Sequence, residues 1–155
     1  MASQQDRIHL LDDTLARAVP ESRGWRRERS PTTSESLGEY WIEVRSPLRP
    51  TVQRLSVLLR HNGDIQVEYH IAENRGSPFE MLFPLAIGQE TDAIESVSQF
   101  VADLLAEQLA LGYAKGLFNG GRRFFGPGSL TESERHGFNW ITSWLGTFDW
   151  PTTPD

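Results

Sequence analysis

Charged and imidazole side chains share one face of a predicted strand near the middle of the chain. This face carries Asp64, Glu68 and His70, which alternate with apolar residues. The preceding predicted strand sets Arg54 and Arg60 opposite them. Carboxylates and imidazoles can act together as general acid and base, but facing arginines lower the pKa of a carboxyl, the wrong direction for an acid at neutral pH. We therefore favour a solvated face with cross-strand ion pairs, and an enzyme using Glu68 and His70 is a third hypothesis.

Two arginine-rich segments could bind phosphate groups. One is a glycine-bounded run in which Arg122 and Arg123 precede two phenylalanines. The other, in the first third of the chain, contains Trp25, Arg26 and Arg27. Guanidinium groups beside aromatic rings are typical of single-stranded nucleic-acid sites. Two arginines in acidic surroundings neutralise few phosphates, which argues against nucleic acid unless the two segments meet in the fold.

The C-terminal segment combines tryptophans with acidic residues. Three of the five tryptophans lie between residues 140 and 150. Large aromatic residues more often pack in a core, whereas tryptophan is also enriched among the anchors of protein interfaces. Both interpretations stay open for this segment. Its candidate partner-binding residues are Glu132, Glu134, Trp144, Phe148, Asp149 and Trp150.

Most other chemistries lack the residues they need. The chain has no cysteine, which excludes disulfides, thiolate metal sites and thiol nucleophiles. Its four histidines are isolated in sequence, and no spacing typical of a metal site joins them to carboxylates. The motifs of phosphate-binding loops, serine hydrolases, zinc proteases and dinucleotide-binding folds are missing. We expect no metal, no cofactor and no catalytic residue.

An α+β fold must position these side chains. Apolar residues at three- and four-residue spacing predict an N-terminal helix and a second, long helix that packs on one sheet face. Between them, two-residue alternation predicts a four-stranded antiparallel meander. We expect a single domain over 1–155, divided into an N-terminal helix (1–19), a connector (20–37), the sheet (38–86), the long helix (90–116) and an aromatic C-terminal segment (117–155).

The central hairpin has a predictable register. A three-residue loop pairs Leu59 with Ile65 and keeps the apolar residues of both strands on one face. Such a loop places Gly63 in the left-handed conformation. Leu58 is left on the polar face.

A short aromatic helix is predicted near the C-terminus. Thr131 and Glu134 have the spacing of a capping box, which marks a helix start. The apolar face of this helix would carry Phe138, Ile141, Trp144 and Leu145.

Charge is unevenly distributed along the 155 residues, whose net charge is −6. Residues 1–60 carry ten arginines against eight acidic residues, whereas residues 61–155 carry five basic residues against thirteen acidic ones. An acidic surface favours a partner with a basic surface. No segment approaches the roughly 18 apolar residues of a membrane span, and the start lacks the pattern of a signal peptide. We expect a cytoplasmic protein without membrane contact.

These observations favour a non-enzymatic, acidic domain that binds another protein. Its most concrete form is an inhibitor or immunity protein that neutralises a toxin, and a small acidic chaperone is a close relative. The alternative is a module that binds nucleic acid or a small phosphorylated ligand through the arginine and aromatic segments. An exposed sheet edge or the aromatic tail could support a homodimer.

Overall fold

The chain folds as the predicted α+β class. A computed structural model describes residues 3–30, 39–47, 52–72, 78–84, 90–115 and 121–151. The chain forms two compact units. Unit 1 comprises Met1–Val44, Arg54–His70 and Pro78–Ala102, and unit 2 comprises Arg45–Gln53, Ile71–Ser77 and Asp103–Asp155.

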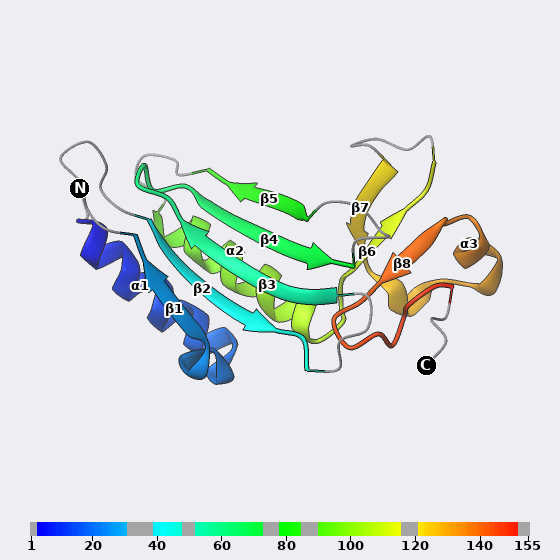
Figure 1. Ribbon diagram of the computed structural model, residues 1–155, viewed down its shortest axis with the longest axis horizontal. Helices are drawn as coiled ribbons and strands as arrows, with labels where there is room; N and C mark the ends of the chain where they lie inside the picture. The colour runs from blue at the N-terminus through cyan, green and yellow to red at the C-terminus, as the bar shows by residue number, and fades with distance from the viewer. Residues whose placement is uncertain are drawn as a thin grey trace. The chain divides into compact units, whose positions relative to one another are not determined.

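The α-helices and β-strands are labelled in Figure 1, and η1 and η4 are short 3-10 helices that carry no label there. In chain order they are α1 (Gln4–Ala18), η1 (Pro20–Gly24), β1 (Arg26–Arg29), β2 (Tyr40–Arg45), β3 (Val52–Leu59), β4 (Ile65–Ile71), β5 (Phe79–Phe83), α2 (Glu90–Leu105), β6 (Ala110–Tyr113), β7 (Arg122–Phe125), η4 (Pro127–Ser129), α3 (Glu132–His136) and β8 (Trp140–Thr142). None of the helices in the described ranges is long and apolar enough to cross a membrane.

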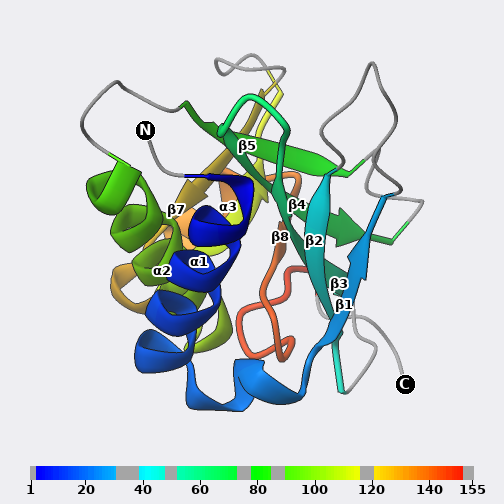
Figure 2. The ribbon, with the colours of Figure 1, turned by 90° about the vertical axis from the view of Figure 1, so that its left-hand side faces the viewer.

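A five-stranded sheet in the order β1-β2-β3-β4-β5 dominates unit 1. Each strand lies beside the next one in sequence, as in the predicted meander (Figure 1). Helices α1 and α2 lie on one face of this sheet (Figure 2). The apolar residues that alternate along the strands are buried on the helix side, so the polar residues between them face the other way.

The predicted hairpin between β3 and β4 is confirmed. The N–H of Arg60 donates to the carbonyl of Asp64 at 2.9 Å, and the N–H of Gly63 donates to the carbonyl of Arg60 at 2.9 Å. Gly63 has a φ of 93°, the left-handed conformation that the three-residue loop requires. Leu59 and Ile65 are both buried, as this register demands.

The sheet contains a fifth strand that the sequence patterns missed. Strand β1 lies within the predicted connector and pairs antiparallel with β2, with Arg26 opposite Glu43 and Arg29 opposite Tyr40. Its four residues are all charged, so no apolar alternation marks it. Backbone pairing at a sheet edge does not need an apolar face.

The prediction that the long helix extends to residue 116 was wrong, because α2 ends at Leu105. Glu107 adopts a left-handed φ of 56°, and the N–H of Gln108 donates to the carbonyl of Asp103 at 2.8 Å. A left-handed residue with such a backward bond ends a helix. The apolar residues that continue the helical pattern, Ala110 and Leu111, are buried in strand β6 instead.

The predicted aromatic C-terminal helix is also corrected. The capping box is present, with the N–H of Glu134 donating to Thr131 Oγ1 at 3.1 Å, but α3 ends at His136. The aromatic segment then forms β8 in a three-stranded sheet of unit 2, ordered β7-β6-β8. Trp140 stacks on Tyr113 of the neighbouring strand with ring centroids 5.7 Å apart, a cross-strand contact that a helix would not make.

Candidate functional site

A hollow of about 200 Å³ lies on the sheet face of unit 1 that points away from the helices. We call it the sheet hollow. No described helix of unit 1 covers this face (Figure 2). Three neighbouring strands supply the lining: Glu39, Trp41 and Glu43 from β2 and the residue before it, Arg54, Ser56 and Leu58 from β3, and Glu68 and His70 from β4.

The first partly buried carboxylate of the sheet hollow belongs to Glu43, whose side chain is 14% exposed. Arg54 Nη1 lies 3.4 Å from Glu43 Oε2, and Ser56 donates to the same oxygen at 3.5 Å. Both contacts are long for hydrogen bonds. Glu43 therefore keeps acceptor capacity for a further, better-placed donor.

A second carboxylate, that of Glu68, bonds His70 across one residue of β4. Glu68 Oε2 lies 3.0 Å from His70 Nε2. Burial, together with the nearby charge of Arg54, lowers the pKa of His70 below its ordinary value of 6.5, although Glu68 opposes the shift. His70 is therefore neutral at neutral pH.

The lining of the sheet hollow is acidic and partly apolar. Three carboxylates face one guanidinium, while Trp41 and Leu58 add apolar surface. The Ser56 hydroxyl bonds Glu43, whereas His70 bonds Glu68. Among the described residues no group of three or more histidines and carboxylates could hold a metal ion.

The structure divides the polar residues that the sequence placed on one face. Glu68, His70 and Arg54 line the sheet hollow. Asp64 and Arg60 instead line a second hollow of about 360 Å³, together with Asn62, Gln66, Glu80 and Leu82. Arg60 donates to Gln66 Oε1 at 3.0 Å there.

Sequence reasoning missed the role of Trp41, Glu43 and Leu58. Two signals for them were present. The alternation in β2 already placed Trp41 and Glu43 on the polar face, and the hairpin register left Leu58 on that face. Both Trp41 and Leu58 are half-buried in the fold.

The acidic and aromatic C-terminal candidates lie in unit 2. Glu132 and Glu134 are exposed on α3, and the Glu134 carboxylate accepts the Thr131 hydroxyl at 2.9 Å. Trp144 is only 5% exposed, and its carbonyl accepts a hydrogen bond from Ser46 at 3.1 Å. A side chain this buried offers little area to a partner, so Trp144 is a core residue.

The remaining C-terminal candidates, Phe148, Asp149 and Trp150, are half-buried and take part in the closure of unit 2. Asp149 Oδ1 accepts the N–H of Ser143 at 3.0 Å. Trp150 forms a bridge with Ile141 through two backbone hydrogen bonds of 2.8 and 2.9 Å. Asp149 and Trp150 therefore stabilise the fold of unit 2, a role that the sequence did not reveal.

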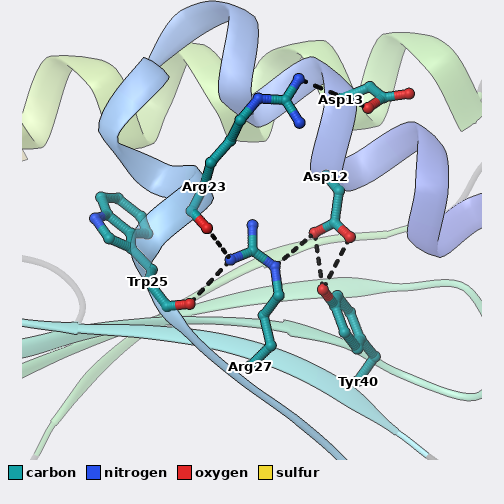
Figure 3. Close-up of polar contacts among 6 residues, drawn as sticks. All are labelled: Asp12, Asp13, Arg23, Trp25, Arg27 and Tyr40. Atoms are coloured by element: carbon teal, nitrogen blue, oxygen red, sulfur yellow. Dashed lines mark hydrogen bonds and ion pairs between the residues drawn. The ribbon is translucent and has the colours of Figure 1, made fainter.

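The arginines of the N-terminal segment form hydrogen bonds and ion pairs with neighbouring residues of unit 1, and Figure 3 shows those of Arg27. Arg27 bonds Asp12 Oδ1 of α1 at 3.2 Å and donates to the carbonyls of Arg23 and Trp25 at 3.2 and 2.9 Å. Arg26 pairs with Glu28 on the same strand. Both guanidinium groups therefore have partners within unit 1.

The second arginine segment lies in unit 2 on strand β7. The Arg123 guanidinium lies 5.9 Å from the ring centre of Phe138, and Arg122 is half-buried. Phe138 in turn stacks on Phe125 at 4.9 Å. Trp25, Arg26 and Arg27 thus belong to one compact unit, and Arg122 and Arg123 to the other.

The hydrogen bond between Tyr40 and Asp12 should make the stability of the protein depend on pH in the alkaline range. The Tyr40 hydroxyl donates to Asp12 Oδ1 at 2.8 Å. Burial, as the larger cause, and this hydrogen bond to the carboxylate raise the pKa of Tyr40 to about 12. Since the folded pKa exceeds the unfolded value of 10.0, the stabilisation is complete below pH 10 and is lost as pH rises towards 12.

Tyr40→Phe should therefore destabilise the protein by about 1 kcal/mol at pH 7, the usual worth of one hydrogen bond. Urea denaturation should show this difference shrinking between about pH 10 and 12. A difference that stays constant to pH 12 would contradict the assignment of the stabilisation to the Tyr40 hydroxyl.

Comparison with known proteins supplies no relative. No protein-family model matches the chain, and no curated protein or solved structure is significantly similar to it. Any functional argument therefore depends on the chain's own geometry.

Proposed function

We propose that this protein is a non-enzymatic, acidic, cytoplasmic domain that binds another protein through the outer face of its five-stranded sheet. The partner presents a basic surface. In its most concrete form the protein is an inhibitor or immunity protein that neutralises a toxin, and a small acidic chaperone is the related form. The observation that carries the proposal is the sheet hollow, with Trp41 and a surplus of carboxylates.

Three properties of this face support a protein partner. The hollow of about 200 Å³ falls below the roughly 300 Å³ at which small-molecule pockets begin. A half-buried tryptophan on a strand is a rigid anchor of the kind that dominates protein interfaces. The surrounding carboxylates would speed association with a basic surface and make the binding salt-sensitive.

The phosphate-binding alternative has weaker support. Arg26 and Arg27 are already paired with carboxylates, so a phosphate would have to displace those partners. Glu132 and Glu134 of unit 2 remain a second acidic surface for a partner. The exposed Leu82 on edge strand β5 offers the sheet contact for a homodimer.

Site-specific cross-linking tests the proposal. A photoreactive phenylalanine analogue at position 41 should capture a basic protein from the native cell, because this side chain lies in the proposed interface. The captured band should weaken when salt is raised, as expected for charge-assisted association. The same analogue at position 9, exposed on α1 on the helix side of the sheet, is the matched control.

A purified candidate partner gives the quantitative readout. Trp41→Ala should weaken its binding at least about tenfold, the usual scale of an aromatic anchor. Equal capture from positions 41 and 9, or unchanged affinity of the Trp41→Ala variant, would refute binding at this face.

A further inference from the structure

We infer that the sheet hollow receives a single arginine side chain from the partner, with its alkyl stem against Trp41 and Leu58 and its guanidinium group between Glu43 and Glu68. This inference rests on the proposed function and names the chemistry of its central contact. Its test uses small capped amino acids, so it can fail or succeed independently of the partner.

The size of the hollow sets the first constraint. The hollow has a volume of about 200 Å³ and is open to solvent on the outer side of the sheet. A hollow of this size has room for the end of one long side chain. The occupant is therefore one residue projecting from a partner whose backbone stays above the sheet.

Charge sets the second constraint. Glu39, Glu43 and Glu68 are opposed only by Arg54 among the charged lining residues, since His70 is neutral. Arg54 is 41% exposed and contacts Glu43 at the long distance of 3.4 Å, so it can turn towards solvent. A cationic group from the partner would complete the charge balance, whereas a carboxylate or phosphate would meet a net negative lining.

The shape of the lining distinguishes arginine from lysine. Trp41 is half-buried and offers an aromatic surface, on which a planar guanidinium or its stem can stack. Glu43 has acceptor capacity that its long contacts with Arg54 and Ser56 leave unused. Five donors in a fixed fork can bond two carboxylates at once, which a lysine ammonium does less well.

Nuclear magnetic resonance titration of the full-length protein tests this inference. The probes are N-acetyl-arginine methylamide, its lysine counterpart and the citrulline counterpart, a neutral isostere of arginine. We expect the arginine probe to shift the Trp41 indole signal with a dissociation constant on the order of 1–10 mM. Citrulline should bind at least about fivefold more weakly because it lacks the charge, and lysine should fall between the two.

Variants of the lining provide the controls. Glu43→Gln and Glu68→Gln should each weaken arginine binding about threefold or more, since each removes a charged acceptor. Glu80→Gln is the matched control, because Glu80 is the exposed cross-strand neighbour of Glu68 on β5 and lies outside the lining. It should leave the affinity unchanged within about twofold. Backbone spectra of all three variants would verify that they fold.

The outcomes separate the two claims. Equal binding of arginine and citrulline, shifts remote from Trp41, or equal loss in Glu80→Gln would overturn the inference. If position 41 still cross-links a basic partner in that case, the proposed function stands without an arginine contact. Arginine binding at Trp41 without any captured protein would establish the site and refute the proposed partner.

Discussion

Glu107→Ala should lower the free energy of unfolding by about 2–4 kcal/mol. Glu107 is only 9% exposed, and its Oε1 accepts the N–H groups of Leu145 and Thr147 at 2.8 and 3.2 Å. Removing the carboxylate takes the acceptor from two N–H groups in partly buried hydrogen bonds, at about 1–2 kcal/mol for each because Leu145 and Thr147 are themselves exposed to water. Urea denaturation at neutral pH would measure the loss.

Two further variants separate the carboxylate from the backbone at this position. Glu107 has a φ of 56°, which is strained for any residue except glycine. Glu107→Gly should therefore be about 1 kcal/mol less destabilising than Glu107→Ala, although both lose the carboxylate. Glu107→Gln keeps an acceptor oxygen and should cost less than either. Equal stability of wild type and alanine variant would contradict the structural role.

The same carboxylate should make the free energy of unfolding depend on pH in the acidic range. Burial raises the pKa of Glu107, but hydrogen bonds from the side chains of Thr147 and Ser143 and from two backbone N–H groups outweigh it, so the net shift is downwards. Since the folded pKa lies below the ordinary 4.5, the stabilisation is present above that value. It is lost as pH falls through the folded pKa, and the gap between wild type and Glu107→Ala should close there.

Gly112→Ala is the second variant with a large expected effect, a loss of about 2–3 kcal/mol. A Cβ atom at this position would lie 2.7 Å from Cε1 of both Phe125 and Phe138. These two rings stack 4.9 Å apart at 15°, so neither can move without disturbing the other. Gly128→Ala, whose new Cβ would have no neighbour within 4 Å, is the matched control.

Thermal unfolding of these variants checks the origin of the effect. The melting temperature should drop for Gly112→Ala and stay nearly unchanged for Gly128→Ala. Adding Phe138→Leu should recover part of the loss, because a smaller side chain makes room for the methyl group. If the two changes are simply additive, the clash with Phe138 is not the cause.

The fold was predictable where apolar residues alternate at a buried surface. The hairpin register followed from Leu59 and Ile65, because a slip by one residue would expose an apolar face. Strand β1 escaped prediction because pairing at a sheet edge uses the backbone and left no apolar pattern in Arg26–Arg29. The end of α2 was missed because Ala110 and Leu111 fit a helix as well as a strand, and the left-handed Glu107 decides between them.

The candidate site was only partly predictable. Glu68, His70 and Arg54 were placed on one polar face from sequence, and the structure brings them into one hollow. The neighbours that complete this hollow, Trp41 and Glu43, come from β2. The predicted meander already sets β2 beside β3 and β3 beside β4, but which side chains of the three strands close one hollow depends on their packing, which the alternation of residues does not give.

The interleaving of the two units along the chain constrains how the protein can be divided into fragments. Each unit is assembled from three separate stretches of the chain, so no single cut separates them. A fragment ending at residue 102 would keep Arg45–Gln53 and Ile71–Ser77 but lose the remainder of their unit. A fragment made by a single truncation would therefore contain neither unit complete and alone.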